Sequence, residues 1–376
     1  MRKLVSIQRV EEVKDIENAD AIQAYRILGW WVVDKKNQYS VGDSVIYLEI
    51  DSWVPTHIAP FLSKGQEPRE YNGVKGERLR TIRLRGQVSQ GLLLSVDILP
   101  GPSRYLPGGY VQFGDFEPVR LFDEGTDLTE ILGIQKWEPT LPAQLQGQAK
   151  GTFPTSLIPK TDQERIQNCF GDIQKKAKRF ATEKVWNAET QTLEEKPVIV
   201  PDDFEEPTYE VTMKLDGSSC TIFRWEGELR VCSRNLELKI NDENKDNTFV
   251  AMAIKIGDRI PDGFAFQGEI MAPGVQGNRE GFTETKFFVF DIFSIRDFAY
   301  LDPIARQFEC KRLGIDHVPV LGMNWKAPES VEEGLALAEG PSINHKIREG
   351  LVWKCNEDPS FSFKTISNEW LLKHGD

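Results

Sequence analysis

One lysine in this chain is well placed to act as a nucleophile. Lys214 ends the strand-like run 208–214 and is followed by Leu215-Asp216-Gly217, so an acidic turn comes directly after the lysine. A lysine amine attacks phosphorus only when it is neutral, so we expect burial or a nearby cation to lower its pKa. The alternative is a lysine that merely enters a tight turn, and this tetrapeptide alone does not separate the two interpretations.

Further acids and bases stand at or near the ends of later predicted strands. Burying such groups costs several kcal/mol unless they are paired, so their recurrence suggests convergence on one polar site. Taken singly, Arg234 fits a hairpin turn, Glu269 an edge strand and Phe290 a core. The segments are Ser233-Arg234-Asn235, Gln267-Gly268-Glu269, Phe290-Asp291, Glu349 to Lys354, and Phe363-Lys364.

Glu349 and Lys354 differ by five positions, which places them on opposite faces of an unbroken strand. We expect Gly350 to permit a bend that lets both side chains face the site.

A second cluster is basic. Arg78, Arg80, Arg83 and Arg85 fall within eight residues. Their parity changes after Arg80, so one continuous strand would need a bulge to keep all four outward. The net charge of −12 argues against broad adhesion to nucleic acid but leaves room for a local basic groove. The alternative is a solvated strand face.

Composition is that of an ordinary globular protein. The 376 residues are 40% apolar and 28% charged, which fits two or three domains. No apolar run has the length of a membrane span, and we expect no cleavable signal at the start. Five scattered cysteines indicate reduced thiols and a cytoplasmic location rather than a zinc site. The four histidines lie in no hydrolase motif, which disfavours histidine catalysis.

The elements predicted along the chain indicate an α+β protein with three segments. Residues 1–133 contain short strands between turn residues, with one short helix within 7–20, and this pattern is typical of a small β-barrel. Residues 134–160 are rich in Gln, Gly and Pro and predict an interdomain linker. Residues 161–376 mix strands with helices and suggest antiparallel sheets flanked by helices.

More detailed expectations concern single elements. In the first segment we expect strands at 3–7, 24–33, 44–48 and 91–96. In the last segment, Thr161 to Glu164 form a capping box that opens a helix through Asn168. The charged stretch 178–206 is expected to be a surface excursion. Strands are predicted at 208–214, 219–225, 228–233, 264–270, 286–293, 350–355 and 360–366, and helices at 247–256, 304–313, 331–338 and the C-terminus.

Taken in this order, the motifs resemble those of the covalent nucleotidyltransferases, the superfamily of RNA ligases, DNA ligases and mRNA capping enzymes. DNA ligases and capping enzymes carry an OB-fold domain after the last lysine motif, whereas only 12 residues follow Lys364. The barrel expected within 1–133 suggests the order of the Deinococcus and Naegleria type of RNA ligase, with an N-terminal OB fold and a C-terminal nucleotidyltransferase. Further segments that resemble this family are 18–20, 41–51, 85–91 and 160–167.

The resemblance implies an ATP-dependent RNA ligase. Lys214 would attack the α-phosphorus of ATP, AMP would pass from the lysine to an RNA 5′-phosphate, and a 3′-OH would then displace AMP. The expected substrates are nicks or breaks in duplex-like RNA, including RNA/DNA hybrid nicks, and the expected state is a monomer. The alternatives are a DNA ligase, a capping guanylyltransferase, or a non-catalytic nucleic-acid-binding protein.

The resemblance also implies roles for individual residues. Lys354 and Lys364 would supply fixed positive charge, Asp216 would orient the lysine or metal-bound water, and Phe290 would stack on adenine, with Phe288 as second choice. Glu269 and Glu349 would bind Mg²⁺ or Mn²⁺. The remaining nucleotide-contacting candidates are Gly217, Arg234, Lys160, Arg165 and Gln167. On the barrel, the candidates for RNA contact are Arg78, Arg80, Arg83, Arg85, Trp30 and Trp31, although core packing is the alternative for both tryptophans.

Overall fold

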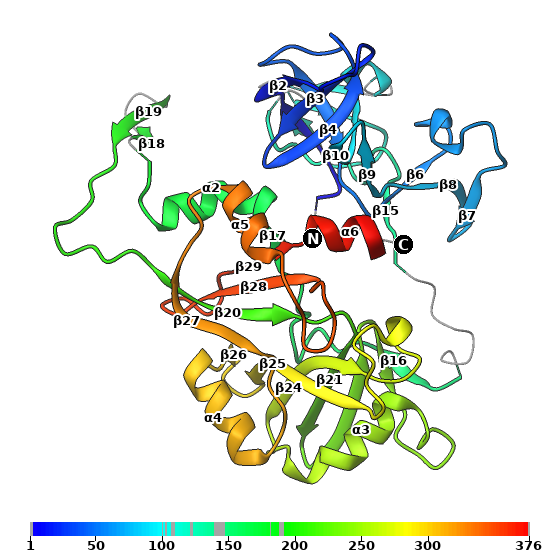
Figure 1. The fold of residues 1–376 in the computed structure, drawn as a ribbon, viewed down its shortest axis with the longest axis vertical. Helices are drawn as coiled ribbons and strands as arrows, with labels where there is room; N and C mark the ends of the chain where they lie inside the picture. Colours follow the sequence, from blue (N-terminus) through cyan, green and yellow to red (C-terminus); the bar gives the residue numbers. More distant parts are fainter. Residues whose placement is uncertain are drawn as a thin grey trace. The chain divides into compact units, whose positions relative to one another are not determined.

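The computed structural model describes residues 3–99, 101, 104–106, 110–120, 123–138, 147–180, 182–187 and 192–374. The chain divides into two compact units, one of Met1–Thr140 with Leu371–Asp376 and the other of Leu141–Trp370 (Figure 1). No helix among the described residues is both long enough and apolar enough to cross a membrane.

The first unit is built almost entirely from short strands. Its central strand β5 (Ser44–Leu48) pairs antiparallel with β1 (Val5–Arg9) and β11 (Leu92–Leu94). Successive side chains of a strand point to opposite faces, so alternate residues of β5 enter two different hydrophobic clusters, Ile46 and Leu48 in one, Val45 and Tyr47 in the other.

The described residues of the first unit form four further small sheets. They are β2 (Glu12–Asp15), β3 (Ile22–Ile27) and β4 (Trp30–Lys35); β9 (Thr81–Leu84) and β10 (Gln87–Gln90); β6 (Ser52–Pro55), β7 (Arg69–Tyr71), β8 (Val74–Arg78) and β15 (Gln135–Lys136); and β12 (Arg104–Leu106), β13 (Tyr110–Gln112) and β14 (Val119–Arg120). Among the described residues of this unit, 3₁₀ turns lie between strands at Pro60–Ser63 and Val96–Ile98.

Two expectations for this unit were wrong. The helix predicted within 7–20 is absent from these described residues, which form β1 and β2. The single strand predicted at 24–33 is a hairpin of β3 and β4, because the chain turns at Leu28, whose φ is 55°.

The second unit contains two large sheets and their helices. The seven-stranded sheet has the order β16 (Ala149–Thr152), β23 (Leu236–Leu238), β22 (Glu228–Ser233), β21 (Ser218–Trp225), β24 (Phe264–Met271), β25 (Lys286–Ser294) and β26 (Ala299–Tyr300). The five-stranded sheet has the order β17 (Glu164–Arg165), β29 (Ser362–Ile366), β28 (Gly350–Cys355), β20 (Thr208–Lys214) and β27 (Val320–Lys326). All neighbours are antiparallel except β17 and β29.

Helices pack against each sheet. Side chains of α3 (Thr248–Ile256) and α4 (Pro303–Leu313) join the core of the seven-stranded sheet, and those of α2 (Ile166–Lys176) and α5 (Val331–Ala338) join that of the five-stranded sheet. The starts of α3, α4 and α5 follow from capping, since Asn247, Asp302 and Ser330 each accept a hydrogen bond from a first-turn amide. A final helix, α6, covers Asn368–His374, and 3₁₀ turns occur at Gly257–Arg259 and Gln276–Asn278.

The capping box predicted at Thr161 to Glu164 was wrong. Helix α2 begins two residues later at Ile166, and Arg165 at its N-cap makes no side-chain capping bond. Glu164 and Arg165 instead pair with β29.

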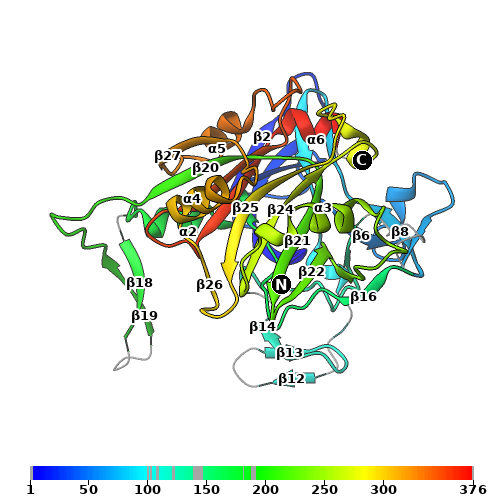
Figure 2. The same cartoon turned by 90° about the horizontal axis from the view of Figure 1, so that it is seen from below.

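Two stretches expected to be irregular contain strands. Within the predicted linker 134–160, β16 pairs with β23, and Phe153 and Ile158 are buried in a hydrophobic cluster. Within 178–206, β18 (Thr182–Asn187) and β19 (Thr192–Pro197) form a hairpin that extends away from the two sheets of its unit (Figure 2). Residues 139–146, 181 and 188–191 of these predicted stretches lie outside the described residues.

Candidate active site

The turn that connects the two large sheets carries the candidate nucleophile. Lys214 ends β20 in the five-stranded sheet, and Ser218 begins β21 in the seven-stranded sheet, so the amine lies where the sheets meet. Gly217 is required in this turn because a β-carbon there would lie 2.4 Å from the carbonyl oxygen of Ile270 and 2.5 Å from the sulfur of Met271. Its N–H donates a hydrogen bond to Glu269 Oε1 at 3.1 Å.

Three carboxylates surround this amine. Lys214 Nζ lies 2.6 Å from Glu349 Oε1, and the charges of Glu269 and Asp216 also act on it. Burial alone would lower the pKa of Lys214, but the three carboxylates outweigh burial and raise it. The expectation that burial lowers this pKa was therefore wrong.

The carboxylates also affect one another. Burial, together with repulsion from Glu349 and Asp216, raises the pKa of Glu269 to about 8 even though Lys214 opposes the shift. Burial and the charge of Glu349 raise the pKa of Asp216 to about 6, although the guanidinium of Arg279 is hydrogen-bonded to it. Carboxylates crowded in this way favour binding of a cation.

The glutamates fit a hydrated divalent ion. Glu349 Oε2 is buried and has no hydrogen-bond partner within the described part of the chain, so it is free to ligate. Among the described residues no set of three His, Cys, Asp or Glu side chains is arranged as a complete ligand cluster. Two carboxylates suit Mg²⁺ or Mn²⁺, since such hard ions take oxygen ligands and Mg²⁺ usually keeps several waters.

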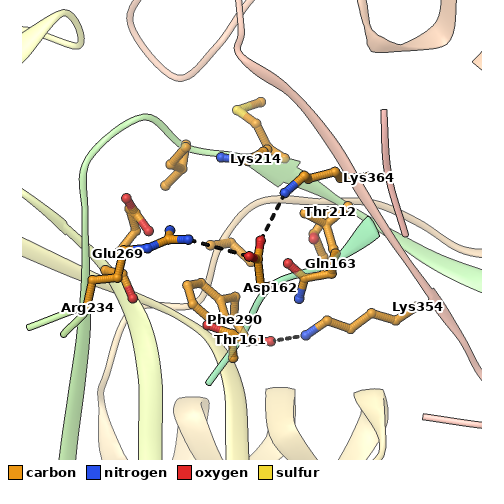
Figure 3. Close-up of a pocket in the computed structure, with 15 residues that line it drawn as sticks. Thr161, Asp162, Gln163, Thr212, Lys214, Arg234, Glu269, Phe290, Lys354 and Lys364 are labelled. Atoms are coloured by element: carbon orange, nitrogen blue, oxygen red, sulfur yellow. Dashed lines mark hydrogen bonds and ion pairs between the residues drawn. The ribbon is translucent and has the colours of Figure 1, made fainter. Parts of the chain in front are cut away.

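Cationic side chains line a pocket next to this amine. Besides Lys214, they are Arg234, which follows β22, Lys354 on β28 and Lys364 on β29. Between two of them lies Asp162, whose carboxylate oxygens are 3.3 Å from Lys364 Nζ and 3.6 Å from the Arg234 guanidinium (Figure 3). The Asp162 carboxylate therefore bridges Lys364 and Arg234, which shows that these two cations are close enough to bind one anion together.

Phe290 lines the same pocket because β25 contains a bulge. Gln267 on β24 pairs with Asp291 and the next residue, Gly268, pairs with Val289, so Phe290 has no partner in this register. The extra residue re-aims the neighbouring side chains, and as a result Asp291 binds Lys354 although it directly follows Phe290. Phe288, the second choice for a stacking ring, packs instead against Phe282, with 5.8 Å between ring centroids.

The predicted bend at Gly350 is wrong. The pairing of β28 with β20 and β29 is regular from Gly350 onward, and Glu349 reaches Lys214 because it lies just before the strand begins. Gly350 serves a close approach, since a β-carbon there would lie 2.1 Å from the carbonyl oxygen of Thr365.

Three predicted nucleotide contacts lie outside the pocket lining. Lys160 donates a hydrogen bond to Asn235 Oδ1 at 2.9 Å, and Arg165 on β17 and Gln167 on α2 are both buried. The residues between them, Thr161, Asp162 and Gln163, line the pocket instead.

The basic cluster of the first unit is divided between interior and surface. Arg78 forms an ion pair with Asp51 at 2.7 Å and stacks 3.8 Å from the centre of the Trp137 ring, which makes it part of the fold. Arg80, Arg83 and Arg85 are exposed on or beside the β9–β10 hairpin.

The two tryptophans also differ in their exposure to solvent. Trp30 is fully buried, whereas Trp31 is partly exposed, with Lys14 and Arg26 each 5.8 Å from its ring centre. The alternative interpretation, that the side chain packs in the core, is therefore correct for Trp30.

Sequence reasoning missed three charged residues of the second unit. Asp162 lies in the segment 160–167 that resembles the family, but the expected capping box assigned the polar side chains of this segment to the start of a helix. Arg279, which binds Asp216, and Arg306, which binds Glu210, have no local pattern that distinguishes them from surface arginines.

Comparison with known proteins agrees with this arrangement. A family model for an OB-fold domain matches residues 4–96 and one for RNA ligases matches residues 207–366, whereas no curated protein matches. Solved structures of Naegleria gruberi RNA ligase are similar over the whole chain. A ligand-free mutant is 36% identical, with a TM-score of 0.77, and covers 100% of this chain and 99% of its own.

Two further structures of that enzyme are equally informative. A mutant with AMP and Mn is 36% identical at a TM-score of 0.76, covering 100% of this chain and 99% of the other. The enzyme with PPi has the same identity and TM-score and covers 100% of both chains. The N-terminal OB fold and the C-terminal ligase fold expected from the sequence are thus confirmed.

Proposed function

This chain belongs to the RNA ligase family, and we propose that it joins RNA ends through an AMP carried covalently on Lys214. The observation that supports this most directly is the placement of one lysine amine among carboxylates at the edge of a pocket lined by three further cations. The similar Naegleria gruberi enzyme has been solved with ATP, AMP, Mn and PPi, which supports ATP as the nucleotide.

The proposed reaction is a relay of three displacements at phosphorus. The neutral amine of Lys214 attacks the α-phosphorus of ATP, a P–N bond forms and pyrophosphate leaves. An oxygen of an RNA 5′-phosphate then attacks the same phosphorus and the P–N bond breaks. Finally the RNA 3′-OH attacks the 5′-phosphate, and AMP leaves as the phosphodiester forms. Each step has a good leaving group, which is what covalent catalysis provides.

The other pocket residues would stabilise and orient the phosphates. Lys354 and Lys364 place fixed positive charge where negative charge develops, and Arg234 is within reach of a ribose or a second phosphate. Phe290 offers a ring on which adenine can stack. A divalent cation held by Glu269 and Glu349 would neutralise negative charge beside Lys214 and so favour its neutral amine.

Asp216 has a defined task in this proposal. Its pairing with Arg279 fixes the turn that carries Lys214 and Gly217, so it would orient the nucleophile. Because its carboxylate is not paired with the lysine itself, Asp216 leaves Glu349 as the direct partner of the amine.

We propose that RNA contacts the first unit at the β9–β10 hairpin. Arg80, Arg83 and Arg85 are exposed and form no ion pair with any other described residue. Ile82 and Leu84 beside them are 48% and 36% exposed. Unpaired arginines next to apolar side chains suit phosphates and unstacked bases, which is how OB folds commonly bind single strands.

Covalent labelling tests the nucleophile. The protein is incubated with ATP or GTP labelled at the α-phosphate, together with a divalent metal, and separated on a denaturing gel. We expect label from ATP that is lost in Lys214→Ala, and retained in Lys239→Ala, whose lysine is exposed outside the pocket. Absence of label with both nucleotides would refute the proposal, and label from GTP alone would favour a capping guanylyltransferase.

Sealing assays then test the substrate. We propose a monomer that joins 3′-OH and 5′-phosphate ends at nicks in duplex-like RNA, including RNA/DNA hybrids. Nicks that differ only in whether RNA or DNA supplies the 3′-OH are compared, and we expect RNA to be preferred. Equal or faster sealing with DNA on that side would favour a DNA ligase.

A further inference from the structure

Behind the pocket lies a buried network of four charged side chains. Arg306 and Glu210 have side-chain exposures of 1% and 0%, and Lys354 and Asp291 have exposures of 6% and 8%. Two positive and two negative charges balance, which is the condition under which such groups tolerate burial.

Arg306 connects elements that otherwise belong to different sheets. It extends inward from α4 and binds Glu210 on β20 of the five-stranded sheet and Asp291 on β25 of the seven-stranded sheet, the latter at 3.5 Å. Its Nε also donates to His317 Nε2 at 3.0 Å. A planar guanidinium presents its N–H donors in a rigid fork, whereas the three donors of an ammonium rotate on a flexible side chain.

Lys354 shares one of these partners. Its ammonium has three N–H groups, of which one donates to the carbonyl oxygen of Phe290 at 2.5 Å and another to Asp291. The same Asp291 oxygen also forms an ion pair with Arg306 Nη1 at 3.5 Å, so the carboxylate is not available to Lys354 alone. Lys354 also lines the pocket, which leaves its remaining N–H for a ligand anion.

We propose that Arg306 is a positioning residue for phosphoryl transfer: by sharing Asp291 with Lys354, it keeps the lysine ammonium directed at the phosphates in the pocket. This inference rests on the proposed function of that pocket. Without Arg306, Asp291 would pair with Lys354 alone, and the Lys354 ammonium would then be directed at Asp291 and away from the phosphates. The competing explanation is that Arg306 only neutralises the buried Glu210.

A double variant separates the two explanations. Arg306→Met with Glu210→Met removes one charge of each sign and leaves the Asp291–Lys354 pair intact. Arg312→Met is the matched control, because this arginine lies on the same helix but is half exposed, and its ion-pair partner among the described residues is Glu309. The rate of Lys214 labelling at saturating ATP, the half-saturating ATP concentration and the final labelled fraction are measured for each protein.

We expect the double variant to label more slowly at saturating ATP, on the order of tenfold or more, with a nearly unchanged half-saturating concentration. A purely structural role would instead reduce the labelled fraction at an unchanged rate, and that result would overturn the inference. Arg306→Lys keeps the charge but not the planar fork, and we expect it to be slowed in the same way; a wild-type rate would likewise contradict the inference.

Different results would refute the proposed function of Lys214 and the proposed role of Arg306. If the wild-type protein takes up no label, the proposed function is refuted. If wild type and Arg312→Met label normally and both network variants match them in rate, only the role of Arg306 is refuted.

Discussion

Protonation of His317 should destabilise the second unit in mild acid. Its Nε2 accepts from Arg306 and its Nδ1 contacts the carbonyl oxygen of Val318 at 2.6 Å, so the neutral ring fits its surroundings. Burial, followed by the positive charge of Arg306, lowers its pKa from 6.5 to about 4, with Lys354 acting in the same direction and Asp291 opposing it. The folded protein therefore binds this proton less readily than the unfolded chain.

The sign and size of the effect follow from linkage. Because the folded pKa is the lower one, stability is lost as the pH falls from 6.5 to 4 and the loss is complete below pH 4. With those two values, folding loses about 2 kcal/mol between pH 7 and pH 5 through this group alone, and about 3 kcal/mol in total. His317→Gln removes the titrating group while an amide can still accept from Arg306.

Urea unfolding at pH 7 and pH 5 measures the effect. Hydrogen exchange in peptides that cover 286–294 and 303–313 follows the second unit separately from the first. We expect wild type to lose about 2 kcal/mol more than His317→Gln between the two pH values. An equal loss in both proteins would show that His317 does not titrate in this window, and the reasoning from burial and Arg306 would be wrong.

Three further predictions concern the pocket. Asp162→Asn should lower the ATP concentration needed for half-maximal labelling, because the carboxylate no longer competes with phosphate for Arg234 and Lys364; an increase would mean that Asp162 instead organises these cations for the nucleotide. Gly217→Ala should cost about 1–3 kcal/mol in urea unfolding and abolish most labelling, since its β-carbon collides with β24. Gly151→Ala, which has open space around it, is the control, and equal stability of the two variants would contradict the packing. Removal of divalent metal with EDTA should stop labelling and added Mg²⁺ or Mn²⁺ should restore it; labelling that persists in EDTA would exclude Glu269 and Glu349 as essential metal ligands.

Much of the site's composition was readable from local sequence. The acidic turn after Lys214 marks it as a candidate nucleophile, and the cost of burying charge near strand ends predicts that Arg234, Glu269, Lys354 and Lys364 converge. The structure does bring these five residues around one pocket and its adjoining carboxylates. The helices at 247–256, 304–313 and 331–338 were also predicted closely, since capping residues and apolar spacing are local properties. The order of the two folds along the chain followed from the strand pattern of residues 1–133 together with the resemblance of the later motifs to those of RNA ligases.

The sequence by itself thus determined the kinds of groups in the site and the two folds that carry them. Tertiary structure alone decided how those groups are aimed and charged. In a regular strand, the side chains of the adjacent residues Phe290 and Asp291 would point to opposite faces. The pairing with β24 introduces a bulge at Phe290, so that the Phe290 ring lines the pocket while Asp291 binds Lys354 of the same pocket. The pKa of Lys214 rises rather than falls, because Glu349 and Glu269, both distant in sequence, join the neighbouring Asp216 around it. Both outcomes depend on contacts between separate strands, which no local pattern of residues encodes.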